Sequence, residues 1–147
     1  MSSTTSLPLA VVADANVIVS ALIGGRARLV FASALGPTCI GATAVADEVL
    51  EHLPGIAERR GFDPTLVTAA LAVIPIEWRP PTAYLPFRSD AERLIGTRDP
   101  DDWPTVALAL ATSLPIWSQD KDFEATGIEI HTTGELLDAI RARGGAT

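Results

Sequence analysis

The stretch LAVVADANVIVSALIGG, residues 9–25, decides the fold that we expect for this chain. Leu9–Ala13 is short, apolar and rich in valine, which is typical of a strand buried on both faces. Asp14 is the first polar residue after that strand. Ala15–Leu22 then has the pattern of a helix that stops at Gly24-Gly25. A buried strand leading directly into a helix predicts the first step of an alternating strand–helix fold with a parallel sheet.

The rest of the chain continues this alternation of strands and helices. Further strands are predicted at Thr38–Ile40, Val73–Ile76, Pro115–Trp117 and Ile128–His131. Further helices are predicted at residues 27–35, 43–60 (with a kink or break at Pro54-Gly55), 64–72, 89–95, 105–112 and 134–143, with a proline-rich loop at residues 79–86. The expected fold class is α/β: a three-layer α/β/α sandwich with a central, mostly parallel sheet of four to five strands. We expect one domain over residues 1–147, with a core from about 9 to 143 and a flexible start at 1–7.

Composition indicates a compact globular protein, because 48% of the residues are apolar and only 20% are charged. The single cysteine, Cys39, excludes an internal disulfide framework. The start of the chain has no basic segment followed by an apolar one, so it does not predict a signal peptide, and no apolar run is long enough to span a membrane. A soluble, cytoplasmic protein is expected. The net charge of −7 by itself weakly opposes nucleic-acid binding.

Four acidic residues fall where a ligand site of a parallel sheet is expected. Asp14 follows the first strand, Glu48 lies in the helix after the second, Asp102 lies just before an Ala/Leu-rich helix, and Asp120 follows the fourth strand. Ligands of such sheets bind beyond the carboxyl ends of the strands. Carboxylates packed there without a cation would repel one another and raise each other's pKa values. A divalent cation removes that conflict, and oxygen-only ligands suit Mg²⁺ or Mn²⁺.

These motifs resemble the PIN-domain family over about residues 9 to 131. The resemblance rests on VVADANVIVSALIGG (11–25), DEVLEHL (47–53), RDPDDWPTVALALA (98–111) and PIWSQDKDF (115–123). It implies an Mg²⁺- or Mn²⁺-dependent endoribonuclease that hydrolyses phosphodiester bonds of RNA with a metal-activated water. Many bacterial members are toxins held inactive by an antitoxin protein, and many are homodimers. The resemblance therefore also implies an antitoxin partner and a dimer.

By this resemblance the metal-binding and catalytic acids would be Asp14, Glu48, Asp102 and Asp120. Asn16 and Ser118 match neighbouring polar positions and would orient ligands or water. Glu48 is preferred to its neighbour Asp47 because that register places Val45, Val49 and Leu53 on one apolar stripe. Asp101 and Asp122 remain open as assisting or alternative ligands.

The third motif departs from the family pattern. Members often carry a further acid where Trp103 stands, and Pro104 follows it. A residue before proline disfavours the helical conformation, so the helix is expected to start late and leave Asp102 outside its first turn. Trp103 is the one tryptophan whose position suggests stacking on a base. The departure keeps open an alternative: a PIN-like module with a degenerate metal site that binds nucleic acid or protein.

Each of these residues taken singly also has a simpler, structural interpretation. Asp14 or Asp102 alone could be a helix cap, and Glu48 alone a solvated helix residue. His52 and His131 lack metal-ligand spacing and are expected to be surface or packing residues. A phospho-acceptor role for Asp14 would require a lysine after a late strand, whereas the only lysine, Lys121, directly follows Asp120. The four acids in this order favour the metal site.

Overall fold

Five parallel strands form one sheet in a computed structural model that describes residues 6–96 and 99–145, apart from the side chains of Lys121 and Asp122. The strand order is β3-β2-β1-β4-β5, and every pairing between neighbours is parallel. The strands are β1 (Ala10–Ala13), β2 (Thr38–Ala42), β3 (Ile76–Arg79), β4 (Ile116–Trp117) and β5 (Ile130–His131). The predicted α/β class and parallel sheet are confirmed.

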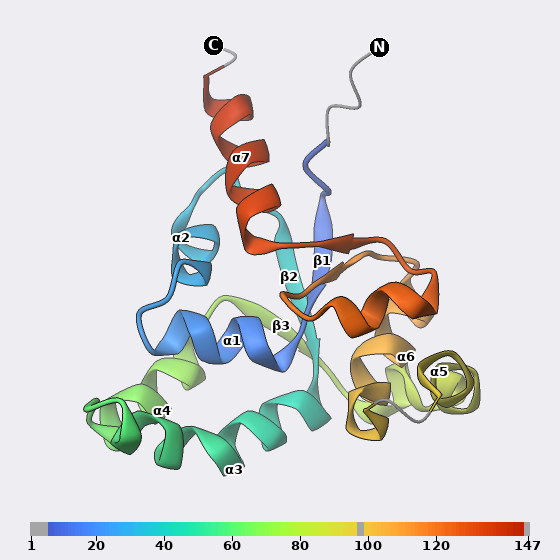
Figure 1. Ribbon diagram of the computed structural model, residues 1–147, viewed down its shortest axis with the longest axis horizontal. Helices are drawn as coiled ribbons and strands as arrows, with labels where there is room; N and C mark the ends of the chain where they lie inside the picture. Colours follow the sequence, from blue (N-terminus) through green and yellow to red (C-terminus); the bar gives the residue numbers. More distant parts are fainter. Residues whose placement is uncertain (1–5, 97–98, 146–147) are drawn as a thin grey trace.

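Helices cover the sheet on both sides. They are α1 (Ala15–Leu22), α2 (Ala27–Ala32), α3 (Thr43–Arg59), α4 (Pro64–Val73), α5 (Arg88–Ile95), α6 (Trp103–Thr112) and α7 (Thr133–Gly144), with short 3-10 turns η1 (Pro81–Ala83), η2 (Leu85–Phe87), η3 (Pro100–Asp102) and η4 (Lys121–Thr126). Figure 1 shows α1, α2 and α4 on one side of β1 and β2, and α5 and α6 on the other. These layers form the predicted three-layer sandwich.

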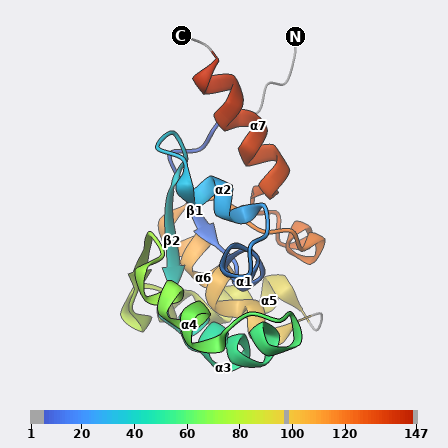
Figure 2. The same cartoon turned by 90° about the vertical axis from the view of Figure 1, so that its left-hand side faces the viewer.

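The core is centred on β1, which lies between β2 and β4. Val11, Val12 and Ala13 are fully buried, and so is Trp117 on the neighbouring strand β4. This burial explains why β1 is apolar throughout, because both of its faces are covered. Figure 2 places α7 at one end of the molecule and α3 and α4 at the other. In Figure 1, β1 and β2 point their carboxyl ends toward the α3 end, and α1 begins there.

The third strand lies later in the sequence than predicted. Val73 ends α4 and is 81% exposed, whereas the strand runs over Ile76–Arg79. β3 is an edge strand, so the alternation of Ile76, Glu77 and Trp78 gives a better guide to it than the apolar run before Pro75. The predicted strand at 73–76 is therefore wrong in its bounds.

Three helix boundaries also differ from the prediction. The second helix ends at Ala32, three residues early. Helix α3 runs unbroken through Pro54, where the sequence predicts a kink or break, because Leu53 and Ala57 anchor it in the core on both sides of the exposed proline. Helix α6 begins at Trp103, immediately after Asp102, with Pro104 in its first turn, where proline is tolerated. The expected late start of this helix is wrong.

The described part of the chain contains no helix that is both long and apolar enough to cross a membrane.

Candidate metal centre

The ends of β1 and β4 place Asp14 and Ser118 side by side. Ala13 pairs with Trp117 in the parallel register, so the next residue of each strand leaves the sheet at the same point. The Ser118 hydroxyl donates a hydrogen bond of 2.7 Å to Oδ2 of Asp14. The same hydroxyl accepts a 2.9 Å bond from the backbone N–H of Asp120. Ser118 therefore connects two of the predicted acids through one side chain.

Asp14 is a buried carboxylate without a cationic partner among the described residues. It is only 2% exposed. Burial raises its pKa to about 6, and the negative charge of Asp120 adds to this, while the Ser118 hydrogen bond and the nearby amides of Ala15 and Asn16 act in the opposite direction. Burial of a charge without a counter-ion costs free energy, and an acid responds by binding a proton or a cation. Asp14 is therefore expected to bind either a proton or a cation.

Asp14 and Asp102 hold helix N-cap positions, at α1 and α6, without capping those helices. Neither side chain makes a capping hydrogen bond. The same chain contains a proper cap for comparison, because Asp63 at the start of α4 accepts a 2.9 Å bond from the backbone N–H of Thr65. A capping role would explain an aspartate at such a position. That explanation does not account for Asp102, and for Asp14 it is incomplete: the amides of Ala15 and Asn16 lower its pKa, but the one side-chain bond that its carboxylate accepts with good geometry among the described residues comes from Ser118.

Asp102 has the most perturbed carboxylate of the site. Its pKa is raised to about 8 by burial, by the charges of Asp14, Asp99 and Asp120, and by a hydrogen bond with the side chain of Asp99. Such an effect requires the acids to lie close together. The structure thus brings three of the four predicted acids, Asp14, Asp102 and Asp120, into one electrostatic group.

Glu48 approaches this group from α3. Val45, Val49 and Leu53 of the same helix are buried, Asp47 is exposed, and Glu48 is half-buried. Burial raises the pKa of Glu48, with further contributions from the charges of Asp101 and Asp99, while His52 one turn later lowers it. Glu48 therefore faces the loop that carries Asp99 and Asp101, and through this loop it is linked to Asp102.

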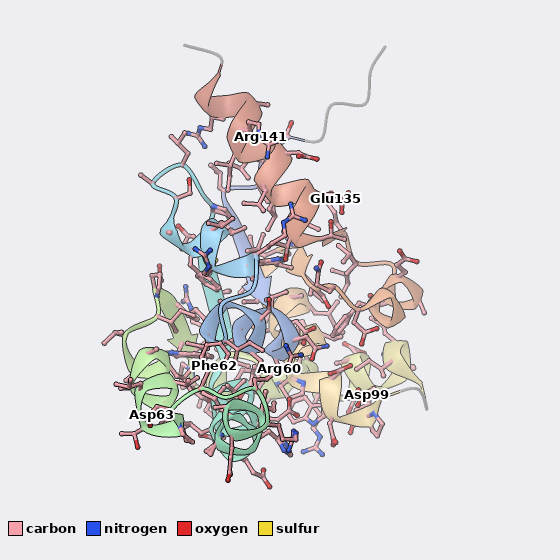
Figure 3. All side chains as sticks on the ribbon, turned by 60° about the vertical axis from the view of Figure 1, so that its left-hand side comes forward. Arg60, Phe62, Asp63, Asp99, Glu135 and Arg141 are labelled. Carbon is pink, nitrogen blue, oxygen red and sulfur yellow. The ribbon has the colours of Figure 1, made fainter. Side chains whose placement is uncertain are left out.

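Asp99 is the acid that the sequence reasoning missed. Its Oδ1 accepts a 3.3 Å hydrogen bond from the N–H of Asp101 and so caps the turn η3. Its charge also raises the pKa of both Asp102 and Glu48. Figure 3 labels Asp99 in the loop between α5 and α6, in the lower part of the view, where α3 also lies. The Asp-Pro-Asp-Asp spacing is the signal that could have identified it, because the turn folds the first aspartate back toward the last.

Asp99→Asn is expected to weaken Mn²⁺ binding about tenfold, the lower end of the losses seen when a partner of a metal ligand is changed. The amide can still cap the turn, but its charge no longer acts on Asp102. Calorimetric titration of Mn²⁺ near neutral pH measures the change. Asp138→Asn on α7, where the side chain is 75% exposed, is the matched control. Unchanged Mn²⁺ affinity would reduce Asp99 to a turn cap.

Tyr84 supports the start of α3 and was also missed by the sequence reasoning. The side chain is buried, and its hydroxyl accepts a 3.2 Å bond from the N–H of Ala44 and lies 3.2 Å from Oγ1 of Thr43. Helix α3 has no side-chain cap of its own. The tyrosine hydroxyl therefore replaces the cap and fixes the helix that carries Glu48.

Tyr84→Phe is expected to lower the free energy of unfolding by about 1–3 kcal/mol, because the buried N–H of Ala44 loses its partner. Urea denaturation followed by circular dichroism measures this loss. Thr82→Ala, an exposed change in η1, should have little effect. Equal stability of the Tyr84→Phe variant and the native chain would mean that water satisfies the helix start.

The remaining candidate residues have mixed positions. Asn16 is exposed on the first turn of α1, and Asp120 is half-buried after β4. Trp103 packs against Tyr84, with ring centroids 5.9 Å apart, and the Arg88 guanidinium lies 4.5 Å from its ring centroid. These contacts give Trp103 a packing role between α5, α6 and η2. The side chain of Asp122 lies outside the described residues.

The donor set fits a hard divalent cation in its chemistry. Every candidate ligand is a carboxylate, and the charges of Asp14 and Asp120 contribute to the raised pKa of Asp102. Mg²⁺ and Mn²⁺ prefer oxygen donors of this kind and keep several waters, so they need few protein ligands at once. Among the side chains that the structure describes, no three His, Cys, Asp or Glu groups already converge in a metal-binding geometry.

Comparison with known proteins gives one family and one similar fold. A family model described as PIN domain matches residues 12–141. A solved structure described as VapBC2 from Rickettsia felis bound to a DNA fragment from their promoter contains a similar chain, with a TM-score of 0.54 and 12% identity. That alignment covers 84% of this chain and 98% of the other. No curated protein sequence matches the chain.

Proposed function

Because this chain belongs to the PIN domain family, we propose that it is an Mg²⁺- or Mn²⁺-dependent endoribonuclease. The substrate would be RNA, and the reaction would be hydrolysis of its phosphodiester bonds. The metal ligands and catalytic acids would be Asp14, Glu48, Asp102 and Asp120. Asp99 would assist Asp102 from the same loop.

One observation carries this proposal: Asp14 and Asp102 are packed together without a countercharge and without capping the helices at whose starts they lie. A purely structural pair of aspartates in these positions would cap α1 and α6, as Asp63 caps α4. Carboxylates that remain uncompensated are costly for the folded chain. Their cost is accounted for if the group serves to bind a cation.

The residues of this chain would divide the work between binding and orientation. When bound, the cation would lower the pKa of a water and offset charge on the phosphate. Asp14 would bind it with the oxygen atoms left free by Ser118, whose 2.7 Å bond keeps the carboxylate in one orientation. Asp102 would give up its proton on binding, since its raised pKa keeps it largely protonated in the metal-free site near neutral pH. Asn16 would orient water or substrate at the mouth of the site.

We also propose a biological setting by analogy. The structural neighbour named VapBC2 and the family resemblance support a toxin role, with a co-expressed antitoxin protein as partner. A homodimer and a cytoplasmic location follow from the same analogy. A co-transcribed small reading frame whose product binds this chain in a pull-down would support the toxin role.

Cleavage of a mixed single-stranded RNA pool tests the enzyme directly. The native chain is incubated with Mg²⁺, Mn²⁺ or EDTA, and the products are separated on a denaturing gel. Cutting with either metal and none with EDTA is the expected result. Absence of cutting together with absence of Mn²⁺ binding in calorimetry would favour the second candidate, a PIN-like binding module with a degenerate metal site. That candidate draws on the lack of a preformed three-ligand group among the described side chains.

A further inference from the structure

A pocket of about 430 Å³ opens along α1, beside the acidic group. Asn16 and Ser20 line it with polar side chains, Val19 and Ile23 with apolar ones, and Arg60 lies opposite the Gly24-Gly25 loop. Its volume is within the range of sites that hold small ligands or parts of larger ones. We propose that this pocket binds the nucleotide of the RNA strand that lies next to the cleaved position, with Arg60 contacting the phosphate of that nucleotide. This inference rests on the proposed function.

The pocket is continuous with the acidic site through α1. Asn16 lies two residues after Asp14, on the first turn of the helix. A helix rises about 1.5 Å per residue, so the pocket extends on the order of 10 Å along α1 from Asn16 to Ile23. Helix α1 packs against α3, which brings the end of α3 beside this pocket. An RNA strand that leaves Asp14 along α1 therefore enters it.

Arg60 is the cation that lines this pocket. Four other arginines form ion pairs with carboxylates, namely Arg79, Arg88, Arg93 and Arg141. Arg60 is exposed and belongs to no ion pair formed among residues 6–96 and 99–145, as is also true of Arg26, Arg28, Arg59 and Arg143. Of these five arginines, Arg60 is the one in the pocket lining, and Figure 3 labels it close to Phe62.

A second arginine reaches the same loop. The Nε of Arg28 donates a 3.4 Å hydrogen bond to the carbonyl oxygen of Gly24. Like Arg60, Arg28 belongs to no ion pair within the described part of the chain, so neither guanidinium is neutralised by a carboxylate there. The planar guanidinium of arginine suits phosphate in particular, because it can donate two parallel hydrogen bonds. The two arginines therefore favour a phosphate at the outer end of the pocket.

The Gly24-Gly25 loop lines this pocket and requires glycine at both positions. Gly24 has a positive φ of 88°, which side chains rarely adopt. A Cβ on Gly25 would lie 2.2 Å from Oγ of Ser20 and 2.9 Å from its carbonyl oxygen. The N–H of Gly25 also donates a 2.7 Å bond to that carbonyl oxygen and closes the turn tightly. The glycine pair thus does more than end α1, since only residues without a side chain fit the close approach of this loop to Ser20.

Binding of a short fluorescein-labelled single-stranded RNA tests the proposal by fluorescence anisotropy. All proteins carry Asp14→Asn so that the RNA is not cut. Adding Arg60→Gln is expected to weaken binding about tenfold and to reduce the dependence of log Kd on log salt by about 0.7, the share of one phosphate contact on a single strand. Arg60→Lys should recover part of the affinity. Arg141→Gln, an exposed arginine on α7, is the matched control and should bind like the parent.

The outcomes separate the pocket from the nuclease. If the Arg60→Gln variant binds RNA with the same affinity and salt dependence as the Arg141→Gln control, the proposal that the pocket binds RNA is overturned, even if the native chain cuts RNA. Arg60-dependent binding by a chain that cuts no RNA with either metal supports the pocket and counts against the enzyme. A chain that neither binds nor cuts the RNA overturns both.

Discussion

Asp14→Asn is expected to reduce metal-dependent RNA cleavage by at least about a hundredfold, because even residues that only orient a metal ligand commonly cost 10–100-fold when changed. The substitution keeps the shape of the side chain. Its carbonyl oxygen can still accept the bond from Ser118. The negative charge that would bind the cation is lost. Initial rates on a labelled RNA with saturating Mn²⁺ measure the effect.

The same variant is expected to be more stable than the native chain when no metal is present. Asp14 is 2% exposed, and its pKa is raised from 3.8 to about 6. Keeping it ionised at neutral pH costs the folded state on the order of 3 kcal/mol, and asparagine removes this cost. The unmet hydrogen bonds of the new amide offset part of the gain. Urea denaturation with EDTA checks the sign.

A matched change in charge controls both measurements. Asp138→Asn removes one exposed carboxylate from α7 and should alter neither the cleavage rate nor the stability. If the Asp14→Asn variant is folded by circular dichroism and cleaves RNA at the native rate, the proposed metal-dependent ribonuclease activity is contradicted. Lower stability in metal-free solution would contradict the cost assigned to the buried charge.

The second large effect concerns metal and pH together. Without metal, the protein is expected to lose stability as the pH rises from about 4 to about 8, because Asp14 and Asp102 have pKa values of about 6 and about 8. An acid whose pKa is higher in the folded chain than in the unfolded chain makes the folded state most stable at low pH, where the acid is protonated in both chains. That advantage disappears as the pH rises through the folded pKa. Mn²⁺ or Mg²⁺ should restore the loss by supplying the missing countercharge.

Thermal unfolding at several pH values, with Mn²⁺ or with EDTA, measures this coupling. At a hundredfold excess over Kd, a ligand raises the Tm of a domain of this size by about 5–10 °C. The rise should be large near pH 8 and small near pH 5, where protonated acids bind cations poorly. The Asp14→Asn variant should lose the part of the pH dependence between about 4 and 6. Equal Tm with Mn²⁺ and EDTA near pH 8 would show that the acids bind no cation.

The sequence was a good guide to the fold wherever burial leaves a clear pattern. Val11–Ala13 is apolar because β1 is covered on both faces, and the Val45, Val49 and Leu53 stripe on α3 is buried as predicted. The pattern failed at β3. An edge strand accepts charged residues such as Glu77, while the apolar end of α4 continues to Val73 and resembles a strand.

The sequence provides candidate members of the site but not their contacts. Strand ends indicate where Asp14 and Asp120 leave the sheet, since parallel strands end at one edge. The side-chain bond from Ser118 joins residues 104 positions apart, and the hydroxyl of Tyr84 reaches Ala44 across 40 positions. Asp99 acts on Asp102 only because η3 folds the loop back. Such contacts depend on side-chain placement after folding, which local sequence patterns do not contain.

The strand order has a consequence for how this chain is made. β1 is synthesised before the other four strands of this sheet, yet one of its two neighbours is β4, which precedes Asp120. A nascent chain can pair β1 with β2 early, but Asp14 meets Ser118 only after most of the polypeptide has left the ribosome. Contacts between such distant segments form late because closing the intervening chain costs entropy. Shortened translation products that stop before β4 would therefore contain a partial sheet and no carboxylate group able to act.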